Sequence, residues 1–158
     1  MNVARAWLGI RSIFHKLPGA ILLLLASGMA QAQEVRFSEL HYDNTGTDVG
    51  EAIEISGPAG TDLTGWSVVL YNGNGGAPYD TDALAGAIPA SCDARGVVVL
   101  NYPANGIQNG APDGLALVDA GGAVVEFLSY EGVFTAVGGA ANGLLSIDIG
   151  VLEVGSEP

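Results

Sequence analysis

Five Asn-Gly pairs interrupt this chain, at positions 72/73, 74/75, 105/106, 109/110 and 142/143. Asn-Gly supplies the positive φ angles that tight hairpin turns need, and it disfavours helices. Short runs rich in Val, Ile, Leu and aromatic residues separate these turns, and their lengths are typical of strands. The sequence therefore predicts an all-β fold, with strands at Val35–Tyr42, Ala52–Ser56, Trp66–Asn72, Val97–Tyr102, Leu115–Asp119, Val124–Tyr130 and Leu144–Ile149.

The apolar pattern inside these runs indicates how the strands are buried. Ile53 and Ile55 alternate with polar neighbours, which predicts a strand with one core-facing side. The run Val97–Leu100 is apolar on both faces and predicts a central strand. In the first strand the apolar phase changes near Ser38 and Glu39, which predicts a β-bulge. Seven or so short strands with Gly-rich turns favour a β-sandwich.

Residues 1–32 have the composition of a helical signal peptide. Arg5, Arg11 and Lys16 form its basic region, Ala20–Ala26 its apolar region, and Ala30-Gln31-Ala32 a cleavage site. A retained membrane anchor is the alternative, but the apolar run is shorter than the ~20 residues that span a bilayer, and no later stretch is long enough. We expect one mature domain, residues 33–158, that is secreted or periplasmic.

The expected mature domain is strongly acidic. It holds all seventeen acidic residues of the chain and only two basic ones, Arg36 and Arg95, which gives a formal net charge of −15. Nucleic-acid binding depends on Lys and Arg, so direct binding of nucleic acid by this chain is not expected. Cys92 is the only cysteine, so no disulfide forms within the chain; a small, semi-buried filler is favoured over a free or intermolecular thiol.

Several segments, taken in order, carry a family resemblance. An opening strand with Ser-Glu (Val35–Asp43) precedes a Gly-Glu-x-x-Glu strand (Gly50–Ile55) and an Asp-Leu-x-Gly-Trp entry to the next strand (Thr61–Val68). Together they resemble the lamin tail domain. Asn101–Asp119 and Val125–Gly132 are similar to the bacterial branch of that family, which accompanies extracellular endonuclease domains.

The resemblance implies an immunoglobulin-like sandwich that serves as a secreted, non-catalytic interaction or accessory module with a protein or cell-surface partner. In that branch the segment similar to Ser146–Val151 leads into another apolar strand and then a nuclease domain. Residues 33–158 are therefore interpreted as a lamin-tail-like domain without its last strand. The alternative is a truncated N-terminal part of a secreted endonuclease whose catalytic domain is absent.

Groups that could run a reaction are scarce, so we predict that the chain is not an enzyme. The expected mature domain has one imidazole, no Gly-x-Ser-x-Gly elbow and no Gly-rich phosphate loop followed by Lys. A cation site is the better candidate. The loop 43–51 places the oxygen donors Asp43, Asn44, Asp48 and Glu51 within nine residues, which suits calcium, although the same residues are typical of a solvated loop. A calcium-stabilised cell-surface adhesion domain is thus a third functional hypothesis.

Three further groups of residues are compatible either with a functional site or with an ordinary structural role. A regular first strand would put Glu39, His41 and Asp43 on one face, either as a metal site or as a solvated polar face. A weaker cation candidate is a second acidic group, which consists of Asp80, Asp82 and Asp93. Three tyrosines could form an exposed binding platform or simply pack at strand ends; they are Tyr71, Tyr79 and Tyr102.

Overall fold

The computed structural model describes residues 35–153, and in this range the chain is all-β. The expected signal peptide, residues 1–32, lies outside the described residues. Within 35–153 no helix is long and apolar enough to cross a membrane. The eight strands are β1 (Arg36–His41), β2 (Ala52–Pro58), β3 (Ser67–Asn72), β4 (Ala77–Ala83), β5 (Arg95–Asn101), β6 (Asp113–Val118), β7 (Val124–Tyr130) and β8 (Ile147–Asp148).

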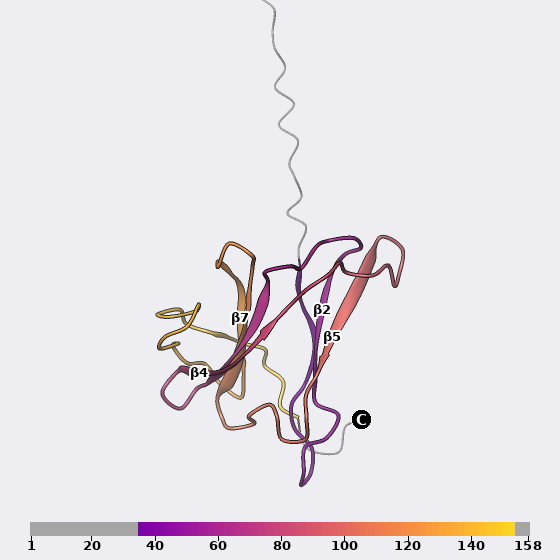
Figure 1. Ribbon diagram of the computed structural model, residues 1–158. Coiled ribbons are helices and arrows are strands. Elements are labelled where there is room, and N and C mark those ends of the chain that lie inside the picture. Colours follow the sequence, from indigo (N-terminus) through magenta and orange to yellow (C-terminus); the bar gives the residue numbers. More distant parts are fainter. Residues whose placement is uncertain (1–34, 154–158) are drawn as a thin grey trace, which may run out of the picture. The chain divides into compact units, whose positions relative to one another are not determined.

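The strands form two sheets with a shared core. The three-stranded sheet has the order β1-β2-β5, and the five-stranded sheet has the order β4-β3-β6-β7-β8. Figure 1 shows β2 and β5 side by side on one side of the domain and β4 and β7 on the other. All pairings are antiparallel except the short parallel contact of β7 with β8. This confirms the all-β prediction and is consistent with a β-sandwich.

The core between the sheets follows from the alternation in the sequence. Ile53 and Ile55 of β2 are fully buried, and they pack in one cluster with Val68 and Leu70 of β3 and with Leu115 of β6. Glu54 and Ser56 face away and are half-buried. Burial of aliphatic side chains of this size contributes about 1.5–3 kcal/mol each, so this cluster stabilises the packing of the two sheets.

The five-stranded sheet is also covered on its outer face. Residues 133–147 fold back over it as an irregular ribbon, which we call the outer ribbon; Thr135 and Leu145 form an isolated antiparallel bridge within it. Its inward residues, among them Phe134, pack with Tyr71 and Phe127 in a second cluster. The rings of Phe127 and Phe134 meet edge to face at 5.3 Å between centroids. The central strands β3 and β6 are therefore buried on both faces, which explains their nearly continuous apolar sequences.

Carboxylates hydrogen-bond to outward amides along the free edge of β1. The predicted bulge is present, since the pairing register with β2 shifts between Phe37 and Glu39. The Phe37 amide donates to Glu126 Oε2 of β7 at 2.7 Å, and the Tyr42 amide donates to Glu153 Oε2 at 2.7 Å. Bulges and charged groups on an edge strand discourage pairing with other chains.

Three strand predictions need correction. The run Val97–Leu100 lies in β5, which is an edge strand rather than a central one, and Val99 is exposed. The strand β4 was not predicted, because its sequence is polar and it lies at the edge of the five-stranded sheet. In the predicted strand Leu144–Ile149, only Ile147 and Asp148 pair as β8.

Candidate functional site

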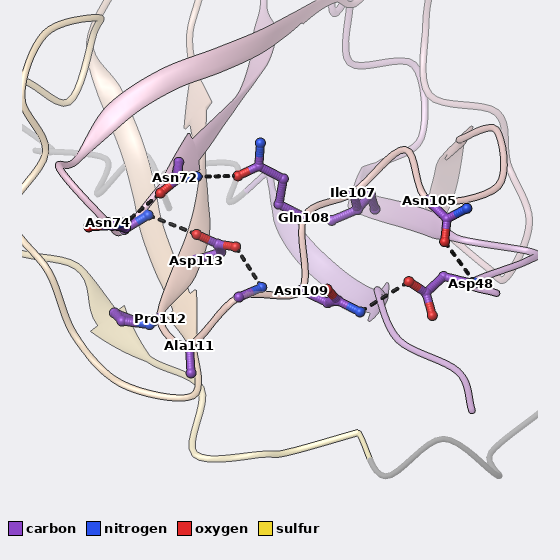
Figure 2. Close-up of a pocket in the computed structure, with 12 residues that line it drawn as sticks. Asp48, Asn72, Asn74, Asn105, Ile107, Gln108, Asn109, Ala111, Pro112 and Asp113 are labelled. Atoms are coloured by element: carbon purple, nitrogen blue, oxygen red, sulfur yellow. Dashed lines mark hydrogen bonds between the residues drawn. The ribbon is translucent and has the colours of Figure 1, made fainter. Parts of the chain in front are cut away.

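A polar groove lies where three loops meet at one end of the sandwich. The loops are 42–51 between β1 and β2, the β3–β4 hairpin tip at 73–76, and the crossover 102–112 that carries the chain from β5 in one sheet to β6 in the other. The groove has a volume of about 760 Å³, within the usual range of ligand sites. Figure 2 shows its lining residues: Asp48, Asn72, Gly73, Asn74, Asn105, Ile107, Gln108, Asn109, Gly110, Ala111, Pro112 and Asp113.

Asp48 links the first loop to the crossover loop. Its carboxylate accepts the Asn44 amide at 2.9 Å and Asn109 Nδ2 at 3.0 Å. Its own amide donates to Asn105 Oδ1 at 3.2 Å, and its carbonyl accepts the Asn105 amide at 3.0 Å. Asp48 is buried, so these bonds replace the water that the carboxylate loses on folding.

Glu51 holds the middle of the crossover loop from the start of β2. Its two carboxylate oxygens accept the backbone amides of Gly106, at 2.7 Å, and Ile107, at 3.0 Å. The side chain is 0% exposed. Hydrogen bonds from backbone amides to an ionised carboxylate are about twice as strong as neutral ones. Glu51 therefore fixes the crossover loop in one conformation.

Asp113 joins the crossover loop to the hairpin tip. Its carboxylate accepts the amide of Gly73 at 2.8 Å and the amide of Gly110 at 2.8 Å. Burial raises the pKa of Asp113 above its ordinary value of 3.8, although the two amide bonds act in the opposite direction. The hairpin approaches closely here, because a Cβ on Gly73 would lie 1.9 Å from the Pro112 carbonyl oxygen.

Three amide side chains in the groove are oriented by bonds to the protein. The side-chain oxygen of Asn105 accepts a hydrogen bond from the Asp48 amide, and that of Gln108 accepts one from Asn72 Nδ2 at 2.6 Å. These bonds leave the NH2 groups of Asn105 and Gln108 available as donors. Asn109 is held by its NH2 group instead, which leaves its oxygen available (Figure 2). The groove thus presents both donors and acceptors without a positive charge.

Tyrosines support the crossover loop from behind. The Tyr79 hydroxyl accepts the Gln108 amide at 3.0 Å, and the Tyr130 hydroxyl donates to the Gln108 carbonyl. Burial raises the pKa of Tyr79 to about 12. The Tyr102 hydroxyl donates to Asp82 Oδ2 at 2.6 Å. Tyr71 is fully buried, and its hydroxyl accepts the Ala141 amide. The three predicted tyrosines therefore pack as structural groups rather than as an exposed platform.

The four predicted calcium ligands are brought to one end of the domain, but their oxygens are turned toward N–H donors. Asp43 Oδ1 and Asp48 Oδ2 both accept from Asn109 Nδ2, at 3.2 and 3.0 Å. Asn44 Oδ1 accepts the Val49 amide, and Glu51 faces the crossover loop. Among residues 35–153, no group of three or more His, Cys, Asp or Glu side chains is arranged to hold a metal ion. Calcium binding remains a prediction.

His41 and Asp80, each from one of the other two predicted groups, have local partners. His41 Nδ1 lies 3.2 Å from Glu153 Oε1, and its Nε2 lies 3.2 Å from Asn44 Nδ2. Burial would lower the pKa of His41, but the contacts with Glu153 outweigh this effect and raise it above 6.5. Asp80 accepts the amide of Thr81 on β4.

Two residues depart from their expected roles. Cys92 is exposed, whereas the sequence favoured a semi-buried filler, because it lies in the turn that leads into β5. Asp113 has no site signal in the sequence. The sequence Pro112-Asp113-Gly114 is typical of a solvated turn, and only the packing of the hairpin against the crossover loop buries this carboxylate.

No family model, curated protein or solved structure was found to match this chain.

Proposed function

We propose that this chain is an exported, non-catalytic interaction module of the immunoglobulin-like, lamin-tail type, and that it binds its partner through the polar groove. The observation that carries the proposal is the use of Asp48, Glu51 and Asp113. All three are buried acids, and each gives both carboxylate oxygens to N–H donors of the loops that shape the groove.

Burying three carboxylates at one end of a domain is an expensive way to stabilise it, because desolvation offsets much of what the hydrogen bonds contribute. Apolar residues would stabilise loops at lower cost. What the carboxylates provide is a single loop conformation, and a rigid loop loses less entropy when it binds a ligand. This arrangement supports a recognition role for the groove.

The exposed amides favour a neutral, polar ligand surface. Asn105, Gln108 and Asn109 offer two donor groups and one acceptor group in fixed orientations. Hydroxyl groups of a cell-surface glycan match this pattern, because each can donate and accept. The fifteen acidic and two basic residues in 35–153 disfavour polyanions such as DNA. This supports an accessory module over a nuclease, although a truncated endonuclease stays the alternative.

The extracellular or periplasmic location in this proposal rests on the composition of residues 1–32. The lamin-tail assignment rests on the order of the sequence segments, and two facing sheets agree with it. A calcium-stabilised adhesion domain is the remaining alternative, and it rests on the oxygen donors of the loop 43–51; Asn109 Nδ2, which donates to both Asp43 and Asp48, competes with a cation for these oxygens.

An NMR titration tests the groove. Nitrogen-15-labelled protein is titrated with a panel of neutral oligosaccharides, and in parallel with duplex DNA. We expect at least one oligosaccharide to shift the amide signals of residues 105–110, and the Asn105→Ala/Gln108→Ala double variant to lose this response. Asn142→Ala, on the outer ribbon, should respond like the wild type and serves as the matched control.

Two results contradict the proposal. Shifts confined to residues outside the groove, or an equal response from the double variant, would remove the groove as the binding site. Metal-dependent cleavage of DNA by the purified protein would overturn the non-catalytic assignment.

A further inference from the structure

The five Asn-Gly pairs carry a chemical reactivity that the binding role does not use. The backbone nitrogen of the glycine can attack the side-chain amide carbon of the preceding Asn. The new N–C bond closes a succinimide ring, the C–NH2 bond breaks, and ammonia leaves; water then opens the ring to aspartate or isoaspartate. Only water is consumed. Glycine allows the attack most readily because it has no side chain and a flexible backbone.

In this fold all five glycine amides donate a hydrogen bond, so each attacking nitrogen is engaged. Three of them donate to buried carboxylates, and the other two donate to carbonyl oxygens; the Gly106 amide is shared between Glu51 and the Pro103 carbonyl, the latter at 2.9 Å. The bonds are Gly73 to Asp113 at 2.8 Å, Gly106 to Glu51 at 2.7 Å, Gly110 to Asp113 at 2.8 Å, Gly75 to the Gly73 carbonyl at 3.0 Å, and Gly143 to the Ala136 carbonyl at 2.8 Å.

Four of the five Asn side chains are held as well. Asn72 binds Gln108 and the Asn74 amide, Asn105 accepts the Asp48 amide, and Asn109 donates to Asp43 and Asp48. Asn142 accepts the Gly138 amide. Among residues 35–153, the Asn74 side chain has no such partner. Asn74 and Gly75 are both exposed at the hairpin tip, and a Cβ on Gly75 would meet nothing within 4 Å.

We infer that Asn74 is the site of spontaneous deamidation in this protein, and that Glu51 and Asp113 protect Asn105, Asn72 and Asn109 from it. At Asn74 the reaction needs only the rotation of a free side chain and the opening of one local turn. At the three protected pairs it must break a charge-assisted bond and move a loop that is packed in place. The same carboxylates that shape the groove therefore preserve its amides.

The consequence is a slow change of charge at one place in the groove. Asn74 lines the groove together with Asp113. Deamidation adds one negative charge at the mouth, and the isoaspartate product also lengthens the backbone of the hairpin tip by one bond. This inference concerns the covalent chemistry of the chain, so it stands whether or not the groove binds a glycan.

Peptide mapping by mass spectrometry tests the inference on the full chain. The folded protein is incubated in mildly alkaline buffer prepared with oxygen-18 water, which labels each new carboxylate. We expect Asn74 to react about tenfold faster than Asn72, Asn105 and Asn109, because breaking a charge-assisted hydrogen bond slows a reaction by at least this factor. Equal or faster reaction at Asn72, Asn105 or Asn109 would overturn the assignment.

The Glu51→Gln variant tests the protective role directly. Removing the charged acceptor of the Gly106 amide should raise the rate at Asn105, while Asn74 keeps its rate and serves as the internal reference. An unchanged or lower rate at Asn105 would refute protection by Glu51.

A second measurement needs no variant. In concentrated urea the five sites should react at similar rates, because the same dipeptide is then in the same environment. If the deamidation rate of Asn74 exceeded that of the other sites by the same factor in urea as in the folded protein, the fold would not be the cause of the difference, and the inference would fail.

Discussion

Replacing Glu51 by Gln is the sharpest test of how the groove is held together. The substitution keeps the size of the side chain but turns one carboxylate oxygen into an NH2 group. In the wild type the two oxygens accept the amides of Gly106 and Ile107 at 2.7 and 3.0 Å, and the side chain is fully buried. The new NH2 group would face one of these N–H donors, so one hydrogen bond is lost. The Gly106 amide would keep its bond to the Pro103 carbonyl, whereas the Ile107 amide would be left unsatisfied.

The magnitude follows from the number of bonds. A hydrogen bond to a charged acceptor contributes about 1.5–3 kcal/mol. The neutral amide is cheaper to bury than the carboxylate, which offsets part of the loss. We expect the free energy of unfolding to fall by about 2 kcal/mol, which corresponds to a decrease of roughly 5–10 °C in Tm for a domain of this size.

Urea unfolding followed by circular dichroism measures this change. Glu54→Gln is the matched control, since Glu54 lies on the same strand but on its half-exposed face, where it accepts the Ser38 hydroxyl. Its expected cost is below about 0.5 kcal/mol. Hydrogen exchange of the Gly106 and Ile107 amides should accelerate in Glu51→Gln alone. Equal urea midpoints for Glu51→Gln and the wild type would refute the bracing role of Glu51.

Three further predictions address packing, pH and calcium. Gly96→Ala should destabilise the protein by about 3 kcal/mol or more, because its Cβ would lie 1.5 Å from the Pro89 carbonyl oxygen. Gly46→Ala has open space around the new Cβ but a φ of +99°, so it should cost only about 1 kcal/mol. Thermal unfolding of both variants measures the difference. Burial raises the pKa of Asp113, so ionisation of this carboxyl group opposes folding. The stability of the wild type relative to Asp113→Asn should therefore decrease as the pH rises from 3.8 through the raised pKa. Urea titrations over this pH range measure the difference, and an increase in relative stability would contradict the burial effect. Because Asn109 already occupies the space between Asp43 and Asp48, neither EDTA nor millimolar calcium should shift Tm; a calcium-dependent rise that Asp43→Asn abolishes would instead establish the calcium site.

The sequence by itself determined the local structure of this protein. Turn residues and short apolar runs predict β2, β3, β6 and β7, and the change of apolar phase predicts the bulge in β1, because turn chemistry and side-chain period depend on neighbouring residues alone. It did less well where a strand's place in the sheet mattered. The apolar run in β5 lies at an edge and the polar β4 is a real strand, since pairing partners distant in sequence decide both.

Only the tertiary structure decided what the polar residues do. Asp43, Asn44, Asp48 and Glu51 were noticed as a set of oxygen donors, but their partners lie more than fifty residues away in the crossover loop, apart from the bonds within the loop 43–51 itself. Asp113 was overlooked because a Pro-Asp-Gly sequence is normally solvated. Whether a carboxylate binds a cation, water or a backbone amide depends on which groups the fold brings to it, and that choice is made by long-range packing.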